Sequence, residues 1–110
     1  MTAPMIEWTL EVLDWIRTQL WEKWPEAQLR GSAPDIHPVP YRIRFREDGI
    51  EYWLNLEPQA MRNAAVADVR SLLEDADWIR LLKETGCVSV GVHEQELSKP
   101  VLQPCAAYSH

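Results

Sequence analysis

The polar and apolar residues near the start of the chain follow a helical period. Between residues 4 and 24, polar residues recur at spacings of three and four, and so fall on one stripe of a helix: Glu7, Glu11, Asp14, Thr18 and Glu22. The remaining surface is apolar and holds four tryptophans, Trp8, Trp15, Trp21 and Trp24. These rings cannot all point the same way, so we expect at least one to be exposed or to contact another protein.

The next segments alternate with a period of two. Residues 41–46 and 50–56 flank Asp48-Gly49, a dipeptide typical of a type I′ hairpin turn because both central residues have positive φ. The two-residue turn pairs Glu47 with Ile50, which sets the register of both strands. One face of the hairpin is then apolar, with Ile43, Phe45, Tyr52 and Leu54. The other face carries Arg42, Arg44, Arg46, Glu51, Trp53 and Asn55.

Helical spacing returns after Pro58 and continues to Gly86, with apolar residues at Met61, Ala65, Val69, Leu72, Ala76, Ile79 and Leu82. Residues 59–85 form one long helix or two. A typical helix of about 11–12 residues favours two, the second beginning at Trp78 after a cap at Asp75 or Asp77. Residues 87–92 then alternate valines with small side chains, which predicts a third strand.

These elements predict a single α+β domain over residues 1–110, in the order α-β-β-α(α)-β, with the helices on one face of a small, mainly antiparallel sheet. A right-handed crossover through the helices would place the third strand beside the first and parallel to the second. Three prolines make residues 31–40 an extended connector. Residues 93–110 are predicted to be an irregular tail, in which residues 99–106 form an edge strand or an arm.

Composition excludes several classes of protein. The chain has 110 residues, 46% hydrophobic and 25% charged, and a net charge of -6, which are values of an ordinary globular domain. Acidic residues interrupt the first helix and no basic segment precedes it, so we expect neither a membrane span nor a signal peptide. The predicted compartment is therefore the cytoplasm.

The two cysteines, Cys87 and Cys105, lack the spacing of a metal or redox motif. We expect both to be reduced thiols, as is usual in the cytoplasm. The alternative is one disulfide that ties the tail to the core.

No catalytic set emerges from the motifs. His93 begins the segment HEQEL, but Leu97 stands where a zinc-binding HExxH helix has its second histidine. Cys87 would act as a nucleophile only if a histidine approached it. The four glycines are scattered and form no phosphate-binding loop. We therefore expect no enzymatic activity, no cofactor and no metal.

The arginines of the hairpin are the most specific feature. Arg42, Arg44 and Arg46 project about 7 Å apart along one strand, with Trp53 beside Arg44. This arrangement suits single-stranded nucleic acid, through base stacking and phosphate contacts. Alternatively, it is a solvated sheet face on which Arg46 pairs with Glu51 and Arg44 lies over Trp53. The acidity of the chain opposes a polyanion and favours the second interpretation.

The sequence therefore predicts a small acidic protein-binding module, such as an inhibitor, an immunity-type protein, a chaperone or an adaptor. The excess of tryptophan is typical of a partner or homodimer surface, and the acidity would complement a basic partner. The first candidate patch comprises Arg42, Arg44, Arg46, Trp53 and Asn55. The second comprises Glu7, Glu11, Asp14 and Glu22. Single-stranded nucleic-acid binding through the first patch is the alternative function.

Overall fold

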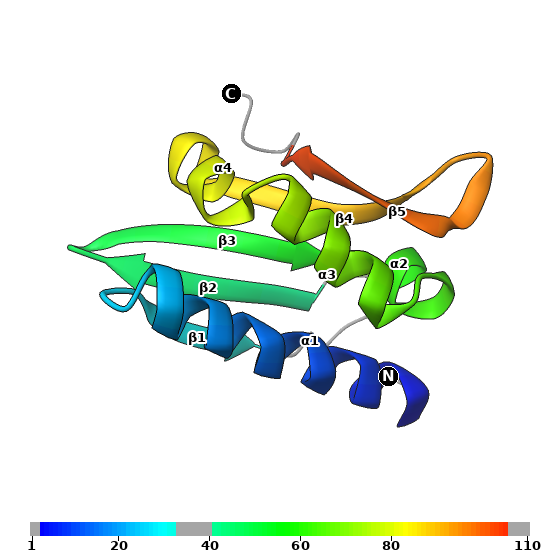
Figure 1. Ribbon diagram of the computed structural model, residues 1–110, viewed down its shortest axis with the longest axis horizontal. Helices are drawn as coiled ribbons and strands as arrows, with labels where there is room; N and C mark the ends of the chain where they lie inside the picture. The colour runs from blue at the N-terminus through cyan, green and yellow to red at the C-terminus, as the bar shows by residue number, and fades with distance from the viewer. Residues whose placement is uncertain (1–2, 33–40, 106–110) are drawn as a thin grey trace.

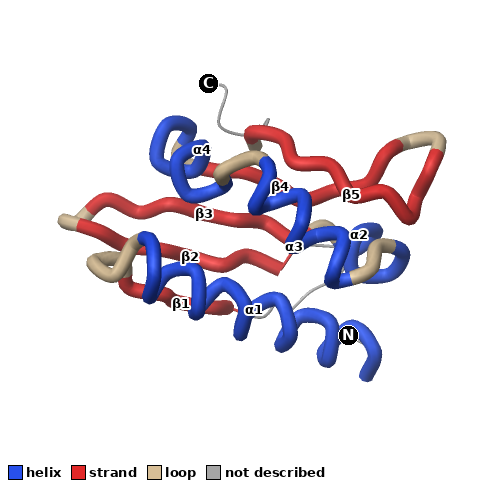
Figure 2. Tube along the Cα trace, in the orientation of Figure 1, coloured by secondary structure: helices blue, strands red, loops and turns tan. Residues whose placement is uncertain are grey.

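Nine helices and strands make up the part of the chain that the computed structural model describes, residues 3–32 and 41–105. In chain order they are α1 (Ala3–Lys23), β1 (Gln28–Ser32), β2 (Tyr41–Glu47), β3 (Ile50–Leu56), α2 (Pro58–Asn63), α3 (Val66–Asp75), α4 (Trp78–Thr85), β4 (Cys87–His93) and β5 (Glu96–Pro104). The strands form one five-stranded sheet in the order β1-β2-β3-β4-β5 (Figures 1 and 2). The α+β class is confirmed.

Helices α1, α3 and α4 lie on one side of the sheet, where α1 follows β1 and β2 while α3 and α4 cover the other half (Figure 1). Alternate residues of the strands meet them there, so that Ile43, Phe45 and Leu54 are fully buried in the core. Trp78 contributes from α4 and lies 5.7 Å from the ring of Phe45. Burial of this apolar face is the main stabilising contribution to the fold.

The β2–β3 hairpin has the register expected from its turn. The pairs run without a break from Glu47↔Ile50 to Tyr41↔Leu56, and include Arg44↔Trp53. Asp48 and Gly49 have φ values of 52° and 77°, as a type I′ turn requires. The local signal was sufficient here because a two-residue turn leaves the strands only one register.

The position of β4 corrects the expected strand order. It is parallel to β3, as predicted, but it pairs with β3 itself, from Trp53↔Cys87 to Leu56↔Val90, and not with β2. The far edge of β2 is occupied by β1, which pairs with it antiparallel from Gln28↔Arg46 to Ser32↔Arg42. The predicted connector is therefore shorter at its start, and its residues 33–40 lie outside the described residues.

Residues 58–85 form three helices, so both alternatives, one long helix and two, are wrong. The break that was not predicted lies at Ala64 and Ala65, between α2 and α3. A left-handed Asp77, with φ of 51°, ends the α3 segment, and α4 begins at Trp78 as expected. Gly86 closes α4 in the left-handed region, with φ of 83°, and its N–H donates to the carbonyl of Leu82. None of the helices in the described residues combines the length and apolar character needed to cross a membrane.

The predicted irregular tail is largely a strand. β5 pairs antiparallel with β4, from His93↔Glu96 to Val88↔Pro104, and forms the edge of the sheet. Beyond it the N–H of Cys105 donates to the carbonyl of Cys87. Residues 106–110 lie outside the described residues.

This pairing joins the two cysteines in a disulfide, with a Cα–Cα distance of 5.4 Å. The expectation of reduced thiols is therefore wrong, and the alternative, a bridge from the tail to the core, is correct. The reason is geometric, because strand pairing brings the two Cα atoms within the 4.4–6.8 Å that a disulfide needs.

Candidate functional site

The face of the sheet turned away from α1, α3 and α4 carries a cluster of arginines. Arg42, Arg44 and Arg46 alternate on β2 with the core residues, as the period of two predicts. β1 adds Arg30, which lies directly opposite Arg44. We call Arg30, Arg42, Arg44 and Arg46 the arginine face. The sequence does not predict Arg30 as part of this face, because it does not predict β1.

Two positive charges of this face lie directly opposite each other. Arg30 and Arg44 are cross-strand neighbours, and like charges in that position destabilise a sheet. Glu51 lies opposite Arg46, yet the two form no ion pair. Among residues 3–32 and 41–105, no ion pair involves Arg30, Arg44 or Arg46. The predicted Arg46–Glu51 pair is thus not formed.

Arg44 occupies the centre of the arginine face and is half-buried. Its Nε atom is shielded from solvent and has no hydrogen-bond partner. Trp53, its neighbour on β3, is also half-buried. The cation–π contacts in the described part of the chain lie between Arg70 and Trp15 and between Lys83 and Trp24. The predicted stacking of Arg44 on Trp53 is therefore not formed.

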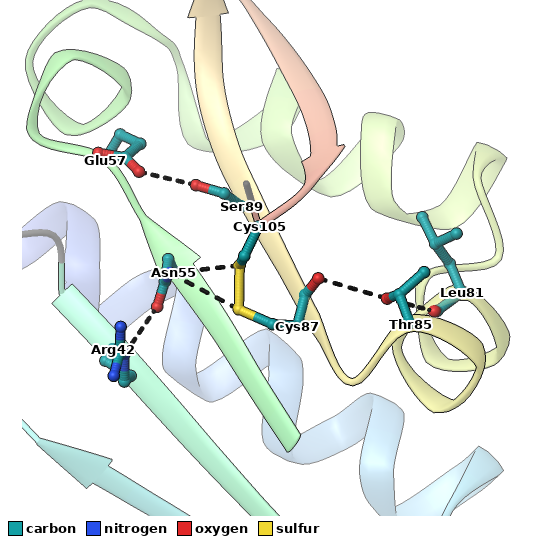
Figure 3. Close-up of a disulfide and its surroundings, with 8 residues drawn as sticks. All are labelled: Arg42, Asn55, Glu57, Leu81, Thr85, Cys87, Ser89 and Cys105. Atoms are coloured by element: carbon teal, nitrogen blue, oxygen red, sulfur yellow. Dashed lines mark hydrogen bonds between the residues drawn. A yellow bond between two sulfur atoms is a disulfide. The ribbon is translucent and has the colours of Figure 1, made fainter. Parts of the chain in front are cut away.

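Asn55 lies beside Arg42 on the neighbouring strand, on the same face of the sheet. It is only 6% exposed, and its Oδ1 accepts a hydrogen bond of 3.1 Å from Nε of Arg42. Its Nδ2 donates to the sulfur of Cys105 at 3.4 Å and to that of Cys87 at 3.8 Å (Figure 3). The structure therefore places Asn55 with its predicted neighbours but uses its amide to hold Arg42, not to face solvent.

A hollow of about 500 Å³ adjoins this face where β3 passes into α2. Its polar walls are Glu57, Gln59, Arg62, Ser89 and Gln103. The hydroxyl of Ser89 donates to Oε1 of Glu57 at 2.8 Å (Figure 3). Ser89 lies beside Asn55 in the sheet, so the hollow continues the row that begins at Arg42.

The residues considered for catalysis are not brought together. Cys87 is held in the disulfide and therefore offers no thiolate. His93 lies at the other end of β4, about 20 Å along the strand, where its Nδ1 accepts a hydrogen bond from the N–H of Gln95. The described residues contain no cluster of three potential metal ligands.

The second candidate patch is assembled on α1, on the opposite side of the sheet (Figure 1). Its four acidic residues, Glu7, Glu11, Asp14 and Glu22, are all exposed. Asp14 pairs with Arg17 at 3.3 Å, which offsets part of the negative charge. Trp21 lies on the same helix and is 82% exposed, which confirms that the four tryptophans cannot share one buried face. The acidic patch of α1 and the arginine face thus lie on opposite sides of the sheet.

No family model matches the chain, no curated protein matches it, and no solved structure matches it.

Proposed function

We propose that the protein is a non-catalytic binding module whose arginine face docks on an acidic surface of another protein. The observation that carries the proposal is the Arg30–Arg44 pair, two like charges set opposite each other without a neutralising carboxylate among the described residues. Such a pair costs stability in the free protein. A partner that supplies carboxylates removes this cost and gains charge-assisted hydrogen bonds.

Single-stranded nucleic acid is the competing ligand, and the fourth guanidinium at Arg30 is the observation that favours it. Two features oppose it. The chain has a net charge of -6, which repels a long polyanion. Platforms that stack successive bases use several aromatic rings, whereas β1, β2 and β3 present one ring on this face, that of the half-buried Trp53.

A charge-reversal experiment tests the proposal. Tagged wild-type protein is used to capture partners from nuclease-treated lysate, beside the variants Arg44→Glu and Glu11→Lys. We expect a stoichiometric protein partner with wild type and Glu11→Lys, and its loss with Arg44→Glu. Arg80→Glu is the matched control, because it makes the same charge change on an exposed helical arginine.

The opposite pattern would move the contact to the acidic patch of α1 and favour a basic partner. A ligand that disappears on nuclease treatment would instead establish nucleic-acid binding. Circular dichroism of each variant separates a lost contact from a lost fold.

The disulfide bears on where the module works. The cytoplasm remains a prediction from sequence, but cytoplasmic thiols are generally kept reduced. Acid quenching of cells followed by alkylation decides this point, because the bridged Cys87 and Cys105 cannot be alkylated. Full alkylation of both cysteines would support a cytoplasmic location. Protection of both cysteines from alkylation would support an oxidising compartment.

A further inference from the structure

The spacing of the arginine face specifies the shape of its ligand. Given the proposed protein-binding function, on which this step rests, we infer that the face binds an extended acidic segment with a carboxylate at every second residue, laid along β2. Arg42, Arg44 and Arg46 are the three contacts along the strand, and Arg30 reinforces the central one.

Extended peptides match the arginines in period. Alternate residues of β2 are about 6.6–6.8 Å apart, and alternate side chains of an extended ligand repeat at the same distance. Acidic residues on one side of a helix recur about once per turn of 5.4 Å. This spacing is more than about 1 Å shorter than that of the arginines, so the mismatch of a helical ligand grows with each contact. Three contacts in line therefore select the extended form.

The centre of the row is the strongest contact. Arg30 and Arg44 stand opposite each other on neighbouring strands, so two guanidiniums reach the same ligand carboxylate. The shielded Nε of Arg44 shows that its guanidinium is partly dehydrated before any ligand arrives. Charge pairs made by a partly dehydrated group are screened less than those of a fully exposed one.

Arg42 is held in position before binding. Its Nε donates to Asn55, whose amide is in turn bonded to the sulfurs of the disulfide (Figure 3). A side chain ordered in the free protein loses less conformational freedom when the ligand docks. At the other end, Glu51 lies opposite Arg46 and weakens its attraction for a carboxylate. We therefore expect the ligand to depend more on Arg42 and Arg44 than on Arg46.

Two labelled peptides of equal composition test the inference on the oxidised full chain. One alternates, Glu-Thr-Glu-Thr-Glu-Thr, and the other is blocked, Glu-Glu-Glu-Thr-Thr-Thr. Fluorescence anisotropy at low salt is expected to show at least tenfold tighter binding of the alternating peptide. Arg44→Gln should weaken the binding of the alternating peptide at least tenfold, and Arg30→Gln should weaken it about threefold. Arg80→Gln, on the helical side, should leave it unchanged.

The outcomes separate this inference from the proposed function. Equal affinity for both peptides, or binding to neither, would overturn the alternating register. The proposed function would still stand if Arg44→Glu abolishes capture of a partner protein. Tighter binding of an oligothymidylate than of the peptide would overturn both proposals. Self-association in sedimentation that disappears with Glu11→Lys would identify the acidic patch of a second copy as the ligand and overturn the extended segment.

Discussion

At the scale of single residues, two tryptophans three positions apart, Trp21 on α1 and Trp24 just after its end, have opposite environments. Trp24 is fully buried, stacked 6.0 Å from the ring of Phe45 and set edge-on 5.3 Å from that of Tyr52. Nζ of Lys83 also lies over the ring of Trp24, 4.7 Å from its centre. Trp21 is 82% exposed. Three residues are nearly one helical turn and would place both rings on the same side of a helix. Because α1 ends at Lys23, Trp24 instead turns into the core.

This contrast gives the first prediction. Trp24→Ala is expected to lower the free energy of unfolding by about 3–5 kcal/mol, because it leaves a large cavity beneath Phe45. Trp21→Ala is the matched control and should change it by less than about 0.5 kcal/mol. Urea denaturation followed by circular dichroism measures both. Similar losses for the two variants would contradict the packing described for α1.

Tyr41 supplies a prediction of pH dependence. Burial raises the pKa of its hydroxyl above 10.0, an effect partly opposed by the nearby charge of Arg17. The unfolded chain therefore loses this proton at lower pH than the folded protein. The contribution of Tyr41 to the free energy of unfolding is therefore fully present below about pH 10, and it is lost as the pH rises through the pKa of the folded state.

We thus expect the free energy of unfolding of the wild type to fall more steeply than that of Tyr41→Phe between about pH 9 and about pH 11, the range that brackets the ordinary tyrosine pKa. Urea denaturation across this range measures the difference, and the variant cancels the titration of lysines, which both proteins share. Parallel curves would show that Tyr41 does not contribute.

At the scale of elements, the strength of the local signal decided which parts of the fold were predictable. The β2–β3 hairpin has a turn dipeptide and clear alternation, so both its register and its arginine row could be derived. β1 contains one large apolar residue, Leu29, and its pairing with β2 depends on a partner distant in sequence. The prolines at positions 100 and 104 obscured β5 in the same way.

The candidate site was predictable to the same extent. The register alone brought Arg42, Arg44 and Trp53 to one face. It did not reveal Arg30, which reaches this face only because β1 pairs with β2. It also did not reveal the burial of Asn55, which contacts the sulfur of Cys105 just after β5. Both omissions are long-range contacts, and no periodicity along the chain encodes them.

The disulfide gives a prediction for β4 and β5. Cys87 and Cys105 are separated by 18 residues, and opening a bridge over a loop of that size typically costs about 2–4 kcal/mol. We expect the Cys87→Ser, Cys105→Ser double variant to unfold at correspondingly lower denaturant than the wild type. The wild type under reducing conditions should approach the variant. If reductant has no effect on the wild type, the bridge does not stabilise the fold.

At the scale of the whole molecule, two charged patches of opposite sign lie on the two sides of the sheet. The acidic residues of α1 lie on the helical side, and the arginine face lies on the other (Figure 1). Within the arginine face, the Arg30–Arg44 pair repels itself, and the acidic residues of α1 are too remote to offset this in solution of ordinary ionic strength. Stability and binding therefore make opposite demands on these residues.

Arg30→Gln tests that opposition. Removing one of the two like charges is expected to raise the free energy of unfolding by roughly 0.2–1 kcal/mol at low salt, and less at high salt. The same substitution should weaken the alternating acidic peptide. Denaturation and anisotropy on one preparation measure both effects. A variant that is less stable would show that Arg30 has a structural role instead.

The single parallel pair in the sheet has a consequence for how the chain folds. β1, β2 and β3 are joined by antiparallel pairing, and so are β4 and β5, but the two groups meet only along β3 and β4. That seam can close only after the chain has looped through α2, α3 and α4. Hairpins form in about 1–10 μs, whereas a long crossover must first lose loop entropy.

We therefore expect Val90→Ala, in the seam, to accelerate unfolding with little change in the folding rate, and Gly49→Ala, in the hairpin turn, to slow folding. Stopped-flow fluorescence measures both rates, and a folding rate that falls with Val90→Ala would reverse this order. The disulfide joins β4 to the residue that follows β5, so it does not tie either strand covalently to β3. The middle of the finished sheet is thus the last part of it to assemble.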